Sequence, residues 1–206
     1  MSTLWLIRHP QPEVAFGVCY GSLDIKLSEA GVRHAKAIAA ELKDQPFAAI
    51  YTSPRQRCRQ AATILAKGRR RQCNELDALR EVDFGQWEGL TYEQIALRAP
   101  EQYDRWMRHP TEFQFPGGEC FADMRGRVLA AAAELRAQHP RDAIALFTHG
   151  GPIRVLIAHA LGIPSANVFR IGVNFGGVSV IEQIGGVPAV IFVNWVIRES
   201  SASPPA

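Results

Sequence analysis

The chain has 206 residues and a net charge of +3; 47% of its residues are hydrophobic and 21% are charged. These are globular values, so we expect one domain over residues 1–199 and a disordered tail over 200–206. The modest charge argues against a nucleic-acid partner, and no apolar run approaches transmembrane length. The four cysteines form no C-x-x-C pair, which favours reduced thiols in the cytoplasm.

Short apolar runs and helix-forming stretches alternate through the first third of the chain. Ser28 stands before an amphipathic stretch and is a typical N-cap. Ser53 followed by Pro54 predicts the cap and first position of another helix. The expected elements are a strand over 3–9, a loop over 10–24, a helix from Ser28 to about Lys43, a strand over 47–52 and a helix from Ser53 to about Lys67.

The same alternation continues to the end of the chain. In order we expect a strand or extended segment over Leu76–Phe84, short helices after Thr91 and over Pro100–Arg108, a helix over about 119–138, a strand over 143–148, a helix over about 151–161 and a hairpin over 176–184 and 189–197. This order predicts a three-layer α/β/α fold with a mostly parallel sheet and flanking helices. The stretch 85–120 is expected to be a helical insertion over the carboxyl edge of the sheet.

Two histidines end apolar runs, and each is followed by a backbone breaker. His9 precedes Pro10, and His149 precedes Gly150. Open α/β sheets bind their ligands at the carboxyl ends of the strands, so the two imidazoles with the adjacent Arg8 indicate an anion site. Taken alone, the Arg8–His9 pair would more often be an ordinary strand end.

Three further features add to this site. Gly150 lets a ligand approach the backbone at a helix N-terminus, which favours anions. Arg55, Arg57 and Arg59 open a helix, and at least one of them must face solvent. Acidic residues at 81, 83 and 88 lie among aromatic residues, where one carboxyl group would act as a general acid.

Together these segments resemble the histidine phosphatase (phosphoglycerate-mutase-like) superfamily. The motifs, in order, are Arg8-His9, a serine and an arginine at 53 and 57, Leu79-x-Glu81 before Gly85-x-Trp87-Glu88-Gly89, and Thr148-His149-Gly150-Gly151. The resemblance implies that His9 is a nucleophile that becomes phosphorylated. It implies that Arg8, Arg57 and His149 bind the phosphoryl group and that Glu81 donates the proton, while Glu88 supports its loop.

The chain departs from the family pattern after the first histidine. The family usually has glycine and glutamate there and an asparagine a few residues on, whereas this chain has Pro10, Gln11 and Ala15. Pro10 has no N–H to donate to phosphate. We therefore expect other groups, such as the backbone or Ser22, to hold the phosphate.

The function we expect is metal-independent hydrolysis of a small phosphorylated metabolite, without a cofactor. The compact length and the stretch Phe115-Pro116-Gly117-Gly118-Glu119 resemble alpha-ribazole phosphatases of cobalamin biosynthesis. One alternative is a phosphoglycerate or phosphosugar mutase, and another is a non-catalytic binding protein on the same fold. The sequence leaves open whether the apolar C-terminal hairpin pairs in a homodimer.

Overall fold

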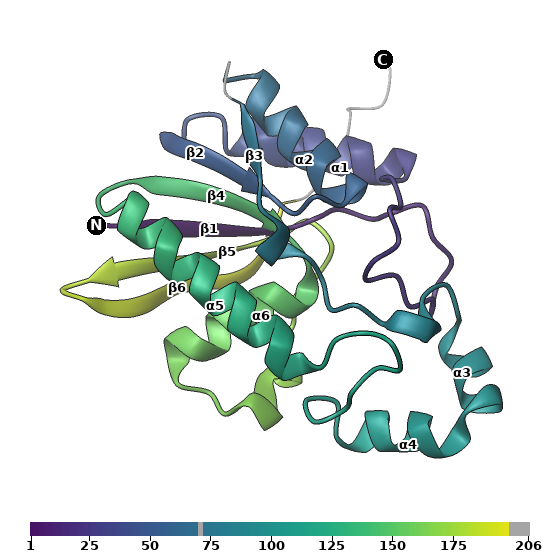
Figure 1. Cartoon of the computed structure of the whole chain (residues 1–206). Coiled ribbons are helices and arrows are strands. Elements are labelled where there is room, and N and C mark those ends of the chain that lie inside the picture. Colours follow the sequence, from purple (N-terminus) through teal and green to yellow (C-terminus); the bar gives the residue numbers. More distant parts are fainter. Residues whose placement is uncertain (70–71, 198–206) are drawn as a thin grey trace.

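The fold is built on one six-stranded sheet (Figure 1). The computed structural model describes residues 1–69 and 72–197. The strands are β1 Thr3–Arg8, β2 Phe47–Thr52, β3 Cys73–Glu75, β4 Ala143–Thr148, β5 Gly177–Ile184 and β6 Val187–Val196, in the order β3-β2-β4-β1-β5-β6. The pairs β1–β4, β2–β4 and β2–β3 are parallel, whereas β1–β5 and β5–β6 are antiparallel. The predicted mostly parallel sheet and closing hairpin are confirmed.

Helices cover both faces of this sheet, which confirms the three-layer α/β/α architecture (Figure 1). They are α1 Glu29–Glu41, α2 Gln56–Lys67, α3 Tyr92–Arg98, α4 Pro100–Arg108, α5 Phe121–Gln138 and α6 Gly150–Leu161. Helices α1 and α2 lie on one face, and α5 and α6 lie on the other. Among the described residues, no helix is long and apolar enough to cross a membrane.

The central strands β1 and β4 are buried on both faces because their side chains alternate between two cores. Leu6 and Leu146 pack with α5 and α6, and Ile7 and Phe147 pack with α1 and α2. This double burial explains why both strands are continuous apolar runs. The two strands end at Arg8 and Thr148, directly before the two histidines.

The start of α1 agrees with the prediction, but the start of α2 does not. Ser28 Oγ accepts a hydrogen bond from the Gly31 N–H, as an N-cap should. Ser53 does not cap α2, whose N-cap is Arg55. The Ser53 N–H instead donates to the Phe147 carbonyl oxygen, which extends the pairing of β2 with β4, so the helix begins later.

The segment Leu76–Phe84 is extended only in part. The strand lies just before it, at β3, and Asp77–Leu79 forms a 3₁₀ turn. From Arg80 to Phe84 the chain has no partner strand among the described residues. The side chains of other elements hold its backbone, as shown below.

The insertion contains α3, α4 and a 3₁₀ turn, Gly85–Trp87. It lies beside the ends of the strands, away from the helices that cover the sheet (Figure 1). Its apolar side chains form a separate cluster with Cys19 from the loop before α1: Trp87, Ile95, Trp106, Phe113 and Phe115. The single domain over 1–199 stays a prediction, and the tail 200–206 lies outside the described residues.

Candidate active site

The two strand-end histidines meet at the carboxyl ends of β1 and β4. His9 directly follows β1, and His149 is the N-cap of α6 after β4. Their ring centroids lie 5.2 Å apart, and both side chains are buried. The parallel pairing of Arg8 with Thr148 brings them side by side, as the sequence predicted.

The His9 ring is held in one tautomer by its neighbour. Its Nδ1 atom lies 2.8 Å from the Pro10 carbonyl oxygen, which only accepts hydrogen bonds. Nδ1 therefore carries the hydrogen, and in the neutral ring Nε2 has the free lone pair. Burial, with the charges of Arg57 and Arg8, holds the pKa of His9 well below its usual value, so the ring is neutral near pH 7.

Arg8 reaches the cavity from the end of β1. Its Nη1 donates to the Val173 carbonyl oxygen at 2.6 Å, and its guanidinium carbon lies 4.1 Å from the centre of the Phe175 ring. Its Nε is buried and has no hydrogen-bond partner among the described residues. Arg8 thus has an anchored guanidinium group whose Nε–H has no described partner.

Arg57, on α2, is fully buried. Its Nη atoms donate to three carbonyl oxygens of one loop, those of Tyr20, Gly21 and Leu23. Its Nε also lacks a partner within the described chain. Arg59, by contrast, is half-buried outside the cavity and pairs with the acidic side chains of Asp24 and Glu75, so the three helix arginines do not all face the site.

His149 has polar contacts on the side of α2. Its Nε2 lies 2.8 Å from Ser53 Oγ and 3.5 Å from Cys58 Sγ. Burial, followed by the charge of Arg57, lowers the pKa of His149 well below its usual value. The second imidazole is therefore also neutral near pH 7.

Glu81 presents its carboxylate to the start of α6. Oε2 accepts from the Gly151 N–H at 3.1 Å, and Oε1 accepts from the Val82 N–H at 3.0 Å. A Cβ at Gly151 would lie 2.2 Å from Oε1, so only glycine allows this approach. The Glu81 carboxylate is thus in direct contact with the N-terminus of α6.

These five side chains line one cavity of about 510 Å³. Its outer wall is apolar and comes from the loop before α1, the insertion, α5 and the turn after α6: Val18, Tyr92, Trp106, Met107, Pro110, Phe115, Phe121, Met124 and Phe169. The charged groups lie at the inner end with the histidines. The cavity thus combines cationic and imidazole side chains with an apolar wall.

A comparison with protein-family models identifies the family of this chain. The model of the histidine phosphatase superfamily (branch 1) matches residues 4–196. The chain belongs to the histidine phosphatase superfamily.

Relatives of this histidine phosphatase bear the names of enzymes. Phosphoserine phosphatase 1 of Hydrogenobacter thermophilus is 31% identical over 184 residues, which cover 89% of this chain and 87% of the relative. Adenosylcobalamin/alpha-ribazole phosphatase of Salmonella typhimurium is 28% identical over 192 residues, which cover 93% and 95% of the two chains. The solved structure of YhfR from Bacillus stearothermophilus has a TM-score of 0.88 at 28% identity and covers 93% and 96%. The chain is a phosphatase of this superfamily.

Two further residues predicted for the site do not line the cavity of this phosphatase. The Ser22 hydroxyl is buried without a described partner, and the Ser22 N–H donates to Glu88 Oε1 at 2.7 Å. Glu88 also accepts from the N–H groups of Leu23 and Phe84, so it supports its loop as expected. Ser22 therefore lies behind the pocket wall.

Gly150 has no side chain, and this leaves space for two arginine side chains. A Cβ there would lie 2.8 Å from Arg154 Nη1 and 3.7 Å from the Arg8 guanidinium carbon. Arg154 lines the cavity, and its Nε donates to the Ile171 carbonyl oxygen at 2.9 Å. Gly150 thus permits two arginines to lie close together.

Some contacts of the site left no signal in the sequence. Phe175, in the loop before β5, packs against the His9 ring, with centroids 5.5 Å apart, and against the Arg8 guanidinium group. Tyr20 lies near Arg57 and His9 and lines the cavity. Among the described residues, no three His, Cys, Asp or Glu side chains gather closely enough to hold a metal ion.

Proposed function

We propose that this phosphatase hydrolyses a small phosphomonoester through a covalent phosphohistidine on His9. The observation that carries the proposal is the fixed tautomer of His9. Because Nδ1 donates to the Pro10 carbonyl oxygen, the lone pair of Nε2 is available to attack phosphorus. The lowered pKa of His9 supports the same role, since a protonated ring has no lone pair to offer.

The buried arginines support binding of the transferring phosphoryl group. The Nε–H groups of Arg8 and Arg57 are buried without a protein partner in the described chain. Both guanidinium groups also line the cavity with His9, so phosphate oxygens bound there would lie beside two positive charges. Arg8, Arg57 and His149 then stabilise the negative charge that develops on the equatorial oxygens.

Glu81 moves the proton in both half-reactions. In the first, Nε2 of His9 bonds to phosphorus, the bond from phosphorus to the leaving oxygen breaks, and the Glu81 carboxyl group gives that oxygen its proton. In the second, water attacks the phosphohistidine and the Glu81 carboxylate takes a proton from this water. The N–P bond breaks, inorganic phosphate leaves, and His9 and Glu81 return to their starting states.

No metal ion enters this scheme because the arginines supply the positive charge. We expect hydrolysis of p-nitrophenyl phosphate to continue in EDTA, and acid-labile phosphoenzyme to be trapped by rapid denaturation. His9→Ala should abolish both signals, whereas His109→Ala, an exposed histidine outside the cavity, should leave them unchanged. Wild-type turnover by His9→Ala would overturn the mechanism.

The apolar outer wall bears on the leaving group. Trp106, Phe115 and Phe121 line it, which suits a leaving group with an apolar or aromatic part. Alpha-ribazole carries an aromatic base, so alpha-ribazole phosphate is the substrate we propose first, and with it a place in cobalamin biosynthesis. Phosphoserine, the substrate in the name of another relative, has no such part.

A panel of phosphorylated metabolites tests this choice. We expect alpha-ribazole phosphate to release inorganic phosphate with a higher kcat/KM than phosphoserine or phosphoglycerate. The reverse order would reject the proposed substrate and leave the mechanism standing. Isomerised phosphoglycerate without release of phosphate would instead indicate the mutase.

The cysteines support a cytoplasmic location. Cys19 and Cys58 are buried and Cys73 and Cys120 are half-buried, and all four are free thiols. Such thiols are typical of a reducing compartment.

A further inference from the structure

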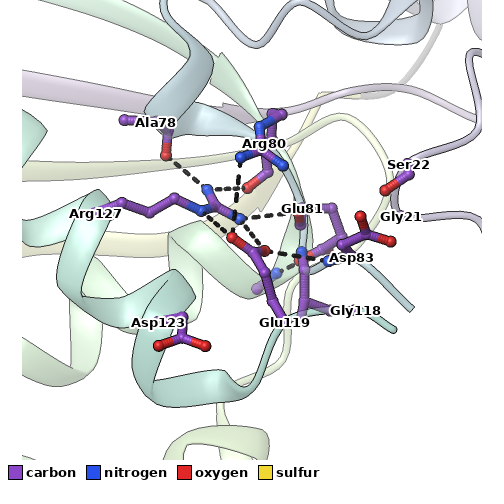
Figure 2. A network of polar contacts seen from close by, with 12 residues as sticks. Gly21, Ser22, Ala78, Arg80, Glu81, Asp83, Gly118, Glu119, Asp123 and Arg127 are labelled. Carbon is purple, nitrogen blue, oxygen red and sulfur yellow. Dashed lines mark hydrogen bonds and ion pairs between the residues drawn. The ribbon is translucent and has the colours of Figure 1, made fainter. Parts of the chain in front are cut away.

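The segment that carries Glu81 is held by side chains instead of a neighbouring strand (Figure 2). Arg127, on α5, donates to the carbonyl oxygens of Ala78, Arg80 and Glu81 at 2.8, 2.8 and 2.9 Å. Thr148 Oγ1, at the end of β4, donates to the Leu79 carbonyl oxygen at 2.6 Å. Four consecutive carbonyl groups are therefore held by two side chains.

All five N–H donors of Arg127 are used. Three go to the carbonyl oxygens of the acid-bearing segment, and Nε and Nη2 donate to the two carboxylate oxygens of Glu119 at 2.8 and 2.7 Å. This two-point pairing fixes the plane of the guanidinium group. We call these two side chains the Arg127–Glu119 pair.

Glu119 holds the same segment from the other side. Its Oε2 accepts from the Asp83 N–H at 3.2 Å, and its N–H donates to the Asp83 carbonyl oxygen at 3.0 Å. The Arg127–Glu119 pair thus contacts the backbone on both sides of the Glu81 side chain. Both side chains are mostly buried, with 16% and 20% of their areas exposed.

Neither residue lines the cavity, so the pair would not touch the substrate itself. The Glu81 carboxylate, however, depends on the backbone that the pair holds. From this geometry we infer that the Arg127–Glu119 pair is a positioning device for the proton donor. The inference rests on the proposed role of Glu81, and it assigns α5 and the end of the insertion a part in the chemistry.

Lysine at position 127 would keep the charge but not the contacts. An ammonium group has three donors and no planar fork, so it would not serve three carbonyl groups and two carboxylate oxygens together. We expect the Glu81 carboxyl group to lose its fixed place. A displacement of about 1 Å costs about 10²-fold in rate.

The test compares two substrates that differ in how much they need the proton. An alkyl phosphomonoester has a poor leaving group, whereas p-nitrophenyl phosphate releases a stable phenolate. Arg127→Lys should lower kcat for the alkyl substrate about 10²-fold with little change in KM, and lower it much less for p-nitrophenyl phosphate. Arg136→Lys, on the same helix and outside the cavity, should leave both rates close to those of the unchanged protein.

A double-mutant comparison separates positioning from a structural role. In a Glu81→Gln background, Arg127→Lys should cost nothing more, because it acts only through the lost proton donor. An equal loss for both substrates, or the same loss in the Glu81→Gln background, would overturn the inference. If Glu81→Gln itself keeps the alkyl rate, the proposed role of Glu81 fails instead.

Glu119→Gln provides a second variant should Arg127→Lys unfold. It keeps one side-chain oxygen for Arg127 and Asp83 and removes the charge and the second acceptor. The same preference for p-nitrophenyl phosphate should appear with a smaller loss of kcat. Thermal unfolding of each variant is measured to establish that the variant is folded at the assay temperature. A folded Glu119→Gln variant with the same substrate preference as the unchanged protein would contradict the inference.

Discussion

The Nδ1 atom of His9 and the carbonyl oxygen of Pro10 lie 2.8 Å apart. Proline has lost the N–H that a glycine would offer at this position, but it keeps its carbonyl group. The acceptor that fixes the His9 tautomer therefore survives the departure from the family pattern. Pro10 changes what the backbone offers to phosphate and leaves the orientation of the imidazole intact.

Pro10→Gly should therefore remain active. The carbonyl acceptor is kept, and the new N–H adds a donor near the pocket, so we expect kcat close to that of the unchanged protein and vanadate binding at least as tight. The free energy of unfolding should fall by about 1 kcal/mol, because glycine gives the unfolded chain more freedom. Steady-state kinetics and urea unfolding measure the two effects. A large loss of phosphoenzyme would show that the proline ring itself orders His9.

The two buried histidines should make stability depend on pH. Both pKa values are lowered by burial, so the folded chain stays neutral at His9 and His149 where the unfolded chain takes up protons. The free energy of unfolding should fall as the pH drops below about 6.5, by at most about 1.4 kcal/mol per pH unit for each ring. Urea unfolding between pH 7.5 and 5 measures the slope, because this range spans the ordinary histidine pKa of about 6.5.

Replacement of one ring identifies the source of that slope. His149→Asn removes one buried imidazole and should flatten the pH dependence, whatever it does to stability at pH 7. His109→Gln, at an exposed position, serves as the control. If both variants keep the full slope, other groups cause the acid instability.

The sequence predicts the side chains at the centre of the site better than the residues that hold them in position. His9 and His149 are found because parallel strands end at one edge of a sheet, so their side chains must meet. Arg127 is not found because three of its five hydrogen bonds go to carbonyl groups, which every residue has and no motif records.

The errors in secondary structure have the same origin. Ser53 looks like a helix cap from its local sequence, but in the fold its hydroxyl contacts His149 and its N–H extends the sheet. Leu76–Phe84 is expected to be a strand or an extended segment, yet it contains a 3₁₀ turn and side chains of distant elements take the place of a neighbouring strand. Such tertiary contacts override local preference.

Gly151→Ala should disable the proton donor without unfolding the chain. A Cβ there would lie 2.2 Å from Glu81 Oε1 and 2.9 Å from Met124 Sδ, so the carboxylate must move. We expect kcat for an alkyl phosphomonoester to fall about 10²-fold. Gly126→Ala, where a Cβ meets nothing within 4 Å, is the matched control and should raise helix stability by about 1 kcal/mol. Equal activity of the two variants would contradict the contact.

Phe169 should favour apolar leaving groups. Its ring lines the cavity, yet 49% of the residue is exposed, so Phe169→Ser should fold. Loss of this apolar contact should lower kcat/KM for naphthyl phosphate by about tenfold or more, since one apolar group in a pocket contributes about 1–3 kcal/mol. For phosphoserine, which has no apolar part to place there, kcat/KM should change little.

The control for this comparison is Leu161→Ser at the end of α6, where 53% of the side chain is exposed and the cavity is not touched. It should leave both substrates unaffected. An equal loss for both substrates in Phe169→Ser would mean that the ring acts on the phosphate end, through the Arg154 guanidinium carbon 5.8 Å from its centre. A loss for naphthyl phosphate alone assigns Phe169 to the leaving group, because the phosphate end is the part that the two substrates share.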